Sequence, residues 1–512
     1  MTSVRGSERG ASVSILSFCL LLVASAGLRF YRLGYQSLWA DEVVTYLSAR
    51  GSLAYVLTQH DINSNIPPLY YLIVNASLWV GDHIGFADRD ILLRLPSVAF
   101  GLLSIPMLLA VLRPLIGQSG ARGAAVMMGI SPFHLWYSQE ARPYALLVLL
   151  SLLGVWCLQQ ALAHPRSLGW RAVVVIAGAA LVYCHTIGVA FVVFLAAYVW
   201  VETSREGRLS WVVTFLAIGL LLVPAAWRLY ALPPVMSANA RYSFNPLHVV
   251  YGLWSFGTGY SLGPSLTELH GAGTRQVLLH YGPLVGLVLA FIGGLCLWGA
   301  RGLFQGSITG FRIVMVWFAI PVAFAVLGSM MTVHPFNVRY AILSFPPFLG
   351  AMAVGMEGLR ARPLRWAAWG ILAAVSMVSI YQYFYLGRYQ REDNRAGGQF
   401  LSLHASPGDL VIASAPYTVD ALSYYYPERS SRIIGYPDAG TFVDASRIRT
   451  DLAALLGQRA RFWLFLSRTY HSDPNGALVA YCDSSFHRGQ ALEGNGIRVI
   501  LYTRTQSGRT DP

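Results

Sequence analysis

The sequence predicts an α-helical, polytopic membrane protein that ends in a small α/β domain. Of its 512 residues, 55% are hydrophobic and only 12% are charged. The mean hydropathy is +0.50, so the chain is more apolar than an ordinary soluble domain. About eleven apolar runs are long enough, or nearly long enough, to cross a bilayer. After residue 386, strand-like runs alternate with helix-like runs, which is typical of an α/β domain.

The apolar runs account for most of the first 386 residues. We expect the first of them to be an uncleaved membrane helix, although Arg5 and Arg9 before an apolar core are also typical of a signal peptide. The runs lie near residues 11–28, 91–112, 123–137, 143–163, 171–184, 186–201, 211–229, 281–300, 313–332, 340–358 and 365–386.

The arginines predict the orientation. All 37 basic residues are arginine, because the chain contains no lysine. They recur in alternate loops, which by the positive-inside rule face the cytoplasm together with the N-terminus: Arg113, Arg122, Arg166, Arg171, Arg205, Arg208, Arg301, Arg312, Arg360, Arg362 and Arg365. We therefore expect a multi-pass protein of the inner (plasma) membrane with an extracytoplasmic C-terminus. The net charge of +13 does not indicate nucleic acid, because these arginines separate apolar runs.

Two domains are expected, at residues 1–386 and 387–512. The external loop 29–90 of the first domain contains the apolar stretch "PPLYYLIVNASLWV", which predicts interfacial helices. The second domain has strand-like runs "DLVIASA", "SRIIGY", "RFWLFLS" and "IRVILYT" between helix-like runs. It has no glycine-rich phosphate loop, and the five cysteines form no CxxC pair, so neither a disulfide framework nor a zinc site is indicated.

The rare charges of this chain concentrate on the external face. Ionisable groups at a membrane edge usually face a cavity and have partners. An external site needs a donor that is carried in the membrane, such as a lipid phosphate, which fixed arginines can hold. An acceptor hydroxyl needs a carboxylate base. The candidates are Asp41 and Glu42 for the base, and Arg94, Arg142 and Arg339 for the phosphate.

Six motifs carry a resemblance to a known family. They are "LWADE", "NIPPLYYL", "LRLPSVAFG", "YSQEARPYAL", "YCHT" and "HPFNVRYAIL", in that order along the chain. The chain resembles bacterial integral membrane glycosyltransferases, similar to the protein O-mannosyltransferases and the lipid A aminoarabinose transferase, which share the GT-C fold. The resemblance implies a polyprenyl-phosphate sugar donor and transfer to a lipid, glycan or protein acceptor on the external face.

By this resemblance, Asp41 takes the role of the catalytic base, with Glu42 beside it. The positions expected to bind donor phosphate or substrate are Arg94, Glu140, Arg142, Arg339, Tyr340, Asn65 and His185. The chain departs from its relatives at Ile66, where they often have His or Lys, and at Asn394, where they often have an aromatic residue. Some relatives contact the donor phosphate with a lysine, so arginine must do that work here.

Structural interpretations stand beside these roles. Asp41 and Glu42 could cap an interfacial helix, and Glu140 could pair with Arg142 to hold a turn. His185 could be a hydrogen-bonded core histidine. Arg339 could be an interfacial anchor.

Two functional alternatives remain: a lipid-linked glycan ligase or polymerase, and a non-catalytic transporter or flippase. No cofactor is expected to be required, because arginines can carry the charge of the leaving group. A bound divalent ion is compatible with this chemistry, although no motif indicates one.

Overall fold

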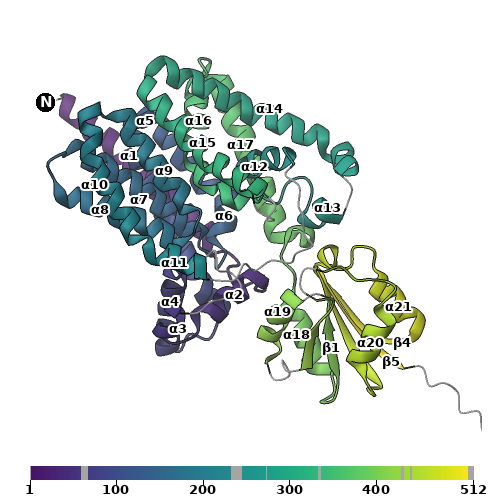
Figure 1. The fold of residues 1–512 in the computed structure, drawn as a ribbon. Coiled ribbons are helices and arrows are strands. Elements are labelled where there is room, and N and C mark those ends of the chain that lie inside the picture. Colours follow the sequence, from purple (N-terminus) through teal and green to yellow (C-terminus); the bar gives the residue numbers. More distant parts are fainter. Residues whose placement is uncertain are drawn as a thin grey trace, which may run out of the picture.

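The computed structural model describes residues 2–58, 67–231, 245–271, 274–331, 336–414, 416–427, 432–438 and 441–504. Helices make up the N-terminal part, and a small sheet with its own helices forms the C-terminal part (Figure 1). The helices of the N-terminal part are α1 (Thr2–Phe30), α2 (Ala40–Ala49), α3 (Leu53–Thr58), α4 (Leu69–Ile84), α5 (Arg89–Ile130), α6 (Pro132–Ser138), α7 (Tyr144–Ala163), α8 (Leu168–Cys184), α9 (Gly188–Glu202), α10 (Arg205–Leu221), α11 (Val223–Ala231), α12 (Leu247–Thr258), α13 (Leu266–Gly271), α14 (Thr274–Gly306), α15 (Ile308–Met331), η1 (Val338–Ser344), α16 (Phe345–Glu357) and α17 (Arg362–Tyr385).

Seven helical stretches in the described residues are long and apolar enough to cross a membrane, and three shorter apolar helices accompany them. The longest stretch, α5, has 42 residues and is broken at Gly117, whose φ of 81° is non-helical. Glycine adopts this conformation without a steric cost, so α5 consists of two arms that correspond to two of the expected runs. The expected number of eleven spans stays a prediction.

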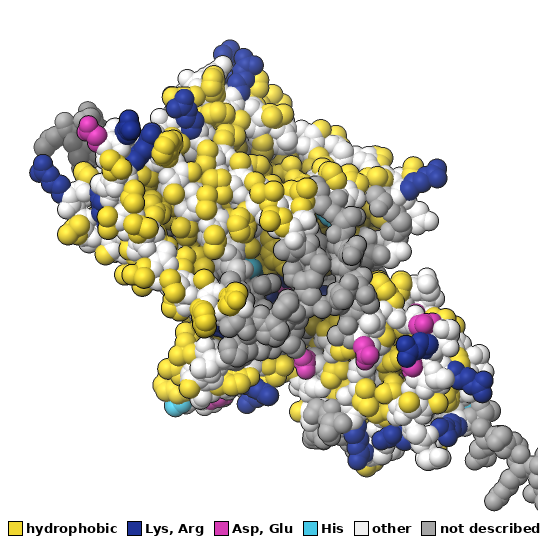
Figure 2. Space-filling view, viewed as in Figure 1, with side chains coloured by type: hydrophobic (Ala, Val, Ile, Leu, Met, Phe, Trp, Pro, Cys, Tyr) yellow, Lys and Arg dark blue, Asp and Glu magenta, His cyan; other side chains and the backbone are white. Residues whose placement is uncertain are grey.

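The outer surface of the helical part is apolar. Space-filling Figure 2 shows hydrophobic side chains across its visible face. A surface of this kind suits lipid rather than water, and the chain is a multi-pass membrane protein. Large exposed hydrophobic residues on these helices include Ile176, Leu216, Leu220, Leu287 and Leu297.

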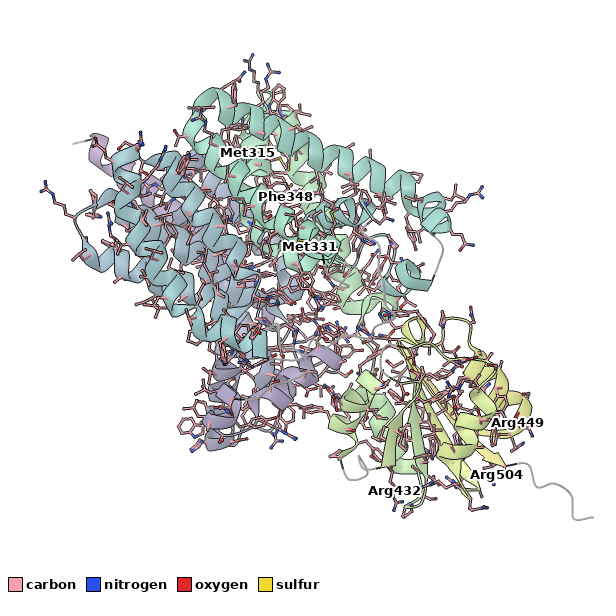
Figure 3. The ribbon with its side chains drawn as sticks, viewed as in Figure 1. Met315, Met331, Phe348, Arg432, Arg449 and Arg504 are labelled. Atoms are coloured by element: carbon pink, nitrogen blue, oxygen red, sulfur yellow. The ribbon has the colours of Figure 1, made fainter. Side chains whose placement is uncertain are left out.

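Close packing of small residues joins the helices. A Cβ placed on Gly299 of α14 would overlap the carbonyl oxygen of Ala351 in α16, and one on Gly355 would overlap that of Leu295. Glycine therefore permits the near contact of these two backbones, as is common between membrane helices. Met315 and Phe348 lie within this helical part (Figure 3).

The external loop expected at 29–90 contains α2, α3 and α4 among its described residues. These helices lie at the end of the helical part that faces the C-terminal domain (Figure 1). Asn394 fastens the two parts together, because its backbone N–H donates to Ser37 Oγ at 3.0 Å and its side chain donates to the Leu38 carbonyl at 3.0 Å. Hydrogen bonds through Asn394 thus hold the start of the C-terminal domain against the external loop.

The C-terminal domain is a five-stranded mixed sheet in the order β2-β1-β3-β5-β4. The pairs β1–β2 and β1–β3 are parallel, while β3–β5 and β4–β5 are antiparallel. Its elements after η2 (Gly387–Tyr389) are α18 (Asn394–His404), β1 (Leu410–Ala413), α19 (Pro416–Tyr425), β2 (Ile433–Gly435), α20 (Ile448–Leu456), β3 (Arg461–Ser467), η4 (Thr469–His471), α21 (Ala477–Ser485), β4 (Phe486–Gly494) and β5 (Ile497–Arg504).

Alternation along the strands buries both faces of this sheet. Leu464 of β3 lies in the core made with α20 and α21, whereas Trp463 and Phe465 lie in the core made with α18 and α19. The expected α/β domain is confirmed, and all four expected strands are present. β4 was not expected, because it is a largely exposed edge strand without a hydrophobic alternation. The exposed arginines Arg432, Arg449 and Arg504 project from the domain into its surroundings (Figure 3).

Candidate active site

Glu42 holds together three segments that are distant in the sequence. It lies in the first turn of α2, and its fully buried carboxylate accepts two bonds of 2.8 Å from Arg94 of α5. Arg391 donates to it at 2.9 Å, and the backbone N–H of Ala141 donates at 2.8 Å. Burial raises the pKa of Glu42, but Arg391 and Arg94 lower it more, to about 2.

The expected catalytic role of Glu42 does not fit this arrangement. The carboxylate is out of reach of a substrate and already bound on both oxygens. Glu42 instead anchors the segments around it, and it also accepts from the backbone N–H of Trp39 at the start of α2, as the capping interpretation expected. The expected contact of Arg94 with phosphate does not fit the structure either. Its guanidinium is buried and donates to Glu42 and to three backbone carbonyls, so no donor remains for a ligand.

Asp41, the neighbour of Glu42, is in a different environment. Its carboxylate is 25% exposed and receives Arg339 Nη1 at 2.8 Å, with Arg142 Nη2 at 3.8 Å from the same oxygen. Burial raises the pKa of Asp41, but the charges of Arg142 and Arg339 lower it by more, so the net shift of the pKa is downward. Asp41 is therefore an ionised, accessible carboxylate between two arginines.

Each of these arginines has one donor without a hydrogen-bond partner in the described part of the chain, but they differ in exposure: the side chain of Arg339 is 22% exposed and that of Arg142 is 3% exposed. The Nε atoms of Arg142 and Arg339 are buried and have no hydrogen-bond partner among the described residues. Arg339 also lies over two aromatic rings, 5.8 Å from the ring centre of Tyr144 and 5.7 Å from that of Tyr340. A planar guanidinium held in this way can grip a phosphate with two parallel bonds.

Glu140 is buried beside these arginines. The expected ion pair with Arg142 is absent among the described contacts, since Arg142 pairs with Asp41 instead. The nearest cation to Glu140 is Arg391, whose Nη2 lies 4.0 Å from Glu140 Oε2. Burial raises the pKa of Glu140 to about 7, against the attraction of Arg391. Glu140 is thus the one carboxyl of the group that titrates near neutral pH.

The remaining expected residues have less direct placements. His185 follows α8, and its Nδ1 accepts a bond of 3.2 Å from the backbone N–H of Ile187. Its ring lies near the rings of Tyr144 and Tyr340. This matches the core-histidine interpretation, with Tyr340 linking the histidine to Arg339. Asn65 lies outside the described residues.

The C-terminal domain adds two arginines that the sequence did not suggest. Arg391 reaches both Glu42 and Glu140, as described above. Arg468 follows β3 with a φ of 50°, pairs with Glu392, and lies 4.8 Å from the ring centre of Trp39. Its charge also contributes to the lowered pKa of Asp41. No local pattern around Arg391 or Arg468 indicates which residues of the N-terminal part they contact.

No group of three or more His, Cys, Asp or Glu side chains in the described ranges is placed to hold a metal ion. The arrangement around Asp41 is instead a single accessible carboxylate and two arginines. It can accept a proton at the carboxylate and bind an anion at the arginines.

Comparisons with known proteins agree with this fold. Residues 65–227 match the model of a family described as dolichyl-phosphate-mannose-protein mannosyltransferase. No curated protein matches the chain in sequence. Among solved structures, ArnT from Cupriavidus metallidurans in the apo state is similar with a TM-score of 0.55 and 11% identity, over 95% of this chain and 98% of that chain.

Two further solved structures show the same similarity. ArnT from C. metallidurans bound to undecaprenyl phosphate matches with a TM-score of 0.53 and 13% identity, over 96% of this chain and 98% of that one. The oligosaccharyltransferase AglB from Archaeoglobus fulgidus, in complex with an inhibitory peptide and a dolichol-phosphate, matches with a TM-score of 0.57 and 12% identity. The match covers 98% of this chain and 75% of that one. The chain is therefore a membrane protein of the GT-C fold class, and the resemblance carried by its six motifs is confirmed.

Proposed function

We propose that this protein transfers a sugar from a polyprenyl-phosphate-linked donor to an acceptor hydroxyl on the external side of the membrane. The observation that carries the proposal is the accessible carboxylate of Asp41, held between Arg339 and Arg142. The family model at residues 65–227 and the shared fold of structures bound to undecaprenyl phosphate and dolichol-phosphate support the choice of donor.

The proposed chemistry uses the arginines and the carboxylate in turn. The donor phosphate takes the guanidinium groups of Arg339 and Arg142, which without donor are bound to Asp41. Asp41 is then free to accept the proton of the acceptor hydroxyl, whose oxygen attacks the anomeric carbon from the side opposite the phosphate. The bond from that carbon to the phosphate oxygen breaks, and the polyprenyl phosphate leaves with the electron pair. This displacement inverts the anomeric centre.

The electrostatics favour this assignment of roles. A lowered pKa keeps Asp41 ionised at neutral pH, and loss of the arginines to phosphate makes the carboxylate a stronger base. The two arginines carry the charge that develops on the leaving phosphate, so the proposed reaction requires no metal. Hexosyl and pentosyl donors both suit this chemistry, as do lipid, glycan and protein acceptors.

The proposed location is the inner membrane, with the N-terminus in the cytoplasm and the C-terminal domain outside it. The alternation of arginine-rich loops supports this orientation. A C-terminal alkaline phosphatase fusion should be active and a cytoplasmic fluorescent reporter at the same position should be dark. The opposite pattern would place the Asp41 site in the cytoplasm and would contradict the proposed use of an external acceptor.

The function is tested with the purified full-length protein and a panel of undecaprenyl-phosphate-linked hexoses and pentoses. The proposal expects release of undecaprenyl phosphate with one of these donors, and transfer of its sugar to envelope lipids or glycans detected by mass spectrometry. Undecaprenyl-diphosphate oligosaccharides serve as the comparison. Transfer from these alone would favour a ligase or polymerase, and the absence of any transfer would favour a transporter.

A further inference from the structure

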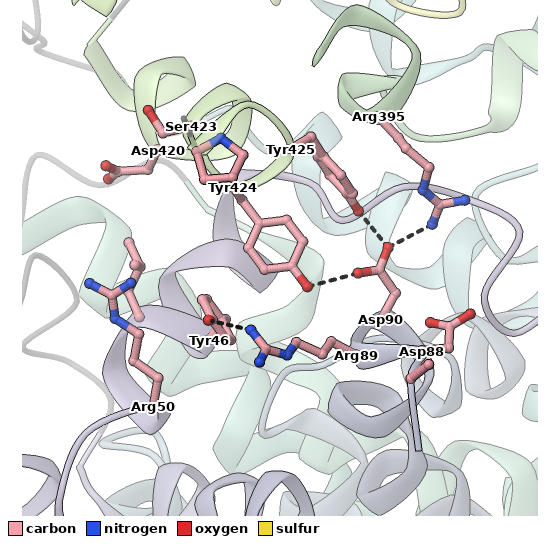
Figure 4. Close-up of a pocket in the computed structure, with 13 residues that line it drawn as sticks. Tyr46, Arg50, Asp88, Arg89, Asp90, Arg395, Asp420, Ser423, Tyr424 and Tyr425 are labelled. Atoms are coloured by element: carbon pink, nitrogen blue, oxygen red, sulfur yellow. Dashed lines mark hydrogen bonds and ion pairs between the residues drawn. The ribbon is translucent and has the colours of Figure 1, made fainter. Parts of the chain in front are cut away.

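A cavity lies between the external loop and the C-terminal domain, and neither Asp41 nor its two arginines line it. It has a volume of about 870 Å³, within the range of ordinary ligand pockets, which often occur at domain interfaces. Figure 4 shows the residues that converge on it. It is lined by Tyr46, Leu47, Arg50, Ala87, Asp88, Arg89, Asp90, Arg395, Asp420, Ser423, Tyr424, Tyr425 and Pro427.

One wall of this interdomain pocket is fixed by Asp90, a buried residue of α5. Tyr424 donates to its Oδ1 at 2.9 Å, while Tyr425 and Arg395 donate to its Oδ2 at 2.5 Å and 2.6 Å. The phenols come from α19 and the arginine from α18, so these bonds hold the C-terminal domain against the external loop (Figure 4). The pocket is therefore formed before any ligand arrives.

A second wall is aromatic. The rings of Tyr46 and Tyr424 meet edge to face with their centres 4.9 Å apart. Arg89 donates to the Tyr46 hydroxyl at 3.3 Å, and the Arg50 guanidinium lies 5.8 Å from the Tyr46 ring centre. These contacts hold two tyrosine rings in fixed positions beside charged groups.

The chemistry of the lining indicates a neutral, polyhydroxylated ligand. Three carboxylates, three guanidinium groups and three phenols line the pocket, against only a few apolar side chains. The positive and negative side chains balance, which favours neither an anion nor a cation. A bound peptide usually needs larger apolar anchors. Many hydrogen-bond donors and acceptors around fixed aromatic rings instead suit the hydroxyl groups and the C–H face of a sugar.

Residues of the pocket and residues around the Asp41 site lie on the same two helices, α2 and α5. The helix α2 has Asp41 in its first turn and Tyr46 five residues later, about 7.5 Å further along the helix axis. One turn of α5 separates Asp90, at the pocket, from Arg94, which binds Glu42. The two sites are therefore close along α2, although five residues of an α-helix turn Tyr46 about 140° away from Asp41.

We propose that the interdomain pocket binds a neutral saccharide of the acceptor, so that the C-terminal domain helps to select a glycan. This proposal rests on the proposed function, because it supplies the acceptor for that reaction. It names a glycan as the acceptor class, in preference to a polypeptide or a lipid without sugars.

Binding is tested on the full-length protein in detergent without any donor. The probes are immobilised neutral hexose and pentose oligosaccharides, with heparin hexasaccharide and a threonine-rich peptide as the competing classes. Ser423→Trp fills the pocket and Tyr46→Ala removes an aromatic wall. Matched controls are Ser402→Trp on the exposed face of α18 and Tyr55→Ala on α3, which is also exposed.

The proposal expects binding of a neutral oligosaccharide that weakens at least tenfold in both pocket variants and is unchanged in both controls. Equal binding by pocket and control variants, binding of heparin or peptide alone, or no binding of any probe would each overturn it. If pocket-dependent binding is found but no lipid-linked sugar is ever transferred, the proposed function fails while the saccharide site stands.

Discussion

Arg339 and Asp41 are 298 residues apart in the sequence, yet Arg339 Nη1 lies 2.8 Å from Asp41 Oδ2. The pair joins the external loop to η1, at the start of the α16 segment. The carboxylate is partly exposed and the arginine also contacts two tyrosine rings. An ion pair that is accessible and incompletely satisfied is poorly suited to stabilising a fold, but well suited to exchanging its partner for a phosphate.

Replacing Arg339 tests the phosphate contact. Arg339→Ala should weaken the apparent affinity for the polyprenyl-phosphate sugar about 10- to 100-fold, the usual range for one or two charge-assisted hydrogen bonds. Arg339→Lys should recover only part of this loss, because an ammonium cannot reproduce the two-pronged grip. The measurement is a donor titration of the initial transfer rate.

Arg275→Ala is the matched control, since Arg275 is an exposed arginine in the first turn of α14. It should leave the donor titration unchanged. If folded Arg339→Ala also keeps the wild-type affinity, Arg339 is an interfacial anchor and the phosphate must be held elsewhere, with Arg142 and Arg468 the next arginines to test.

Glu42 and Asp41 should differ sharply in their effect on stability. Glu42→Gln leaves Arg94 and Arg391 buried beside a neutral amide, and loss of a buried ionic partner typically costs about 3–5 kcal/mol. Asp41→Asn affects only a partly exposed carboxylate, so its cost should stay within about 1 kcal/mol. Thermal unfolding of the purified variants in one detergent compares the two. Similar melting temperatures would contradict the anchoring role given to Glu42.

Glu140 should make stability depend on pH. Burial raises its pKa to about 7 in the folded protein, from 4.5, so the folded state holds a proton that the unfolded state has lost. Stability therefore falls as the pH rises from 4.5 to 7, by up to about 3 kcal/mol, and the full loss persists above pH 7. Glu140→Gln removes this contribution.

The measurement is the melting temperature of wild type and Glu140→Gln at pH 5 and pH 8. The variant should gain stability relative to wild type at pH 8 and much less at pH 5. A difference between the two proteins that is the same at both pH values would mean that Glu140 is not a protonated buried group. Asp82→Asn, which changes an exposed carboxylate of α4, should show no such difference.

The sequence predicted the fold well because membrane helices and buried strands can each be recognised from a local run of hydrophobic residues. An apolar run of bilayer length must be helical, and the strand containing Trp463 is an unbroken hydrophobic run. The exposed edge strand β4 lacked both signals. Two of the expected helices proved to be the two arms of α5, which meet at Gly117. A hydropathy pattern alone does not distinguish such a break within a helix from a loop between two helices.

The site was predicted only in part, because pairing between distant charges depends on the tertiary fold. Asp41, Arg142 and Arg339 were expected on the same side of the membrane, and the structure brings their side chains together. Glu42 and Arg94 were expected to serve the ligand but neutralise each other in the interior. Arg391 enters the group from the C-terminal domain, 349 residues beyond Glu42, and no local pattern specifies where a domain docks.

The most direct test of the account is the transfer rate of Asp41→Asn under saturating donor and acceptor, beside Asp82→Asn as the matched control. Asparagine keeps the size of the side chain but cannot accept the proton, and loss of a general base typically costs about 10²- to 10⁴-fold in rate. The account predicts a loss of that size for Asp41→Asn, with an unchanged melting temperature and a wild-type rate for Asp82→Asn. A folded Asp41→Asn protein that transfers sugar at the wild-type rate would contradict it.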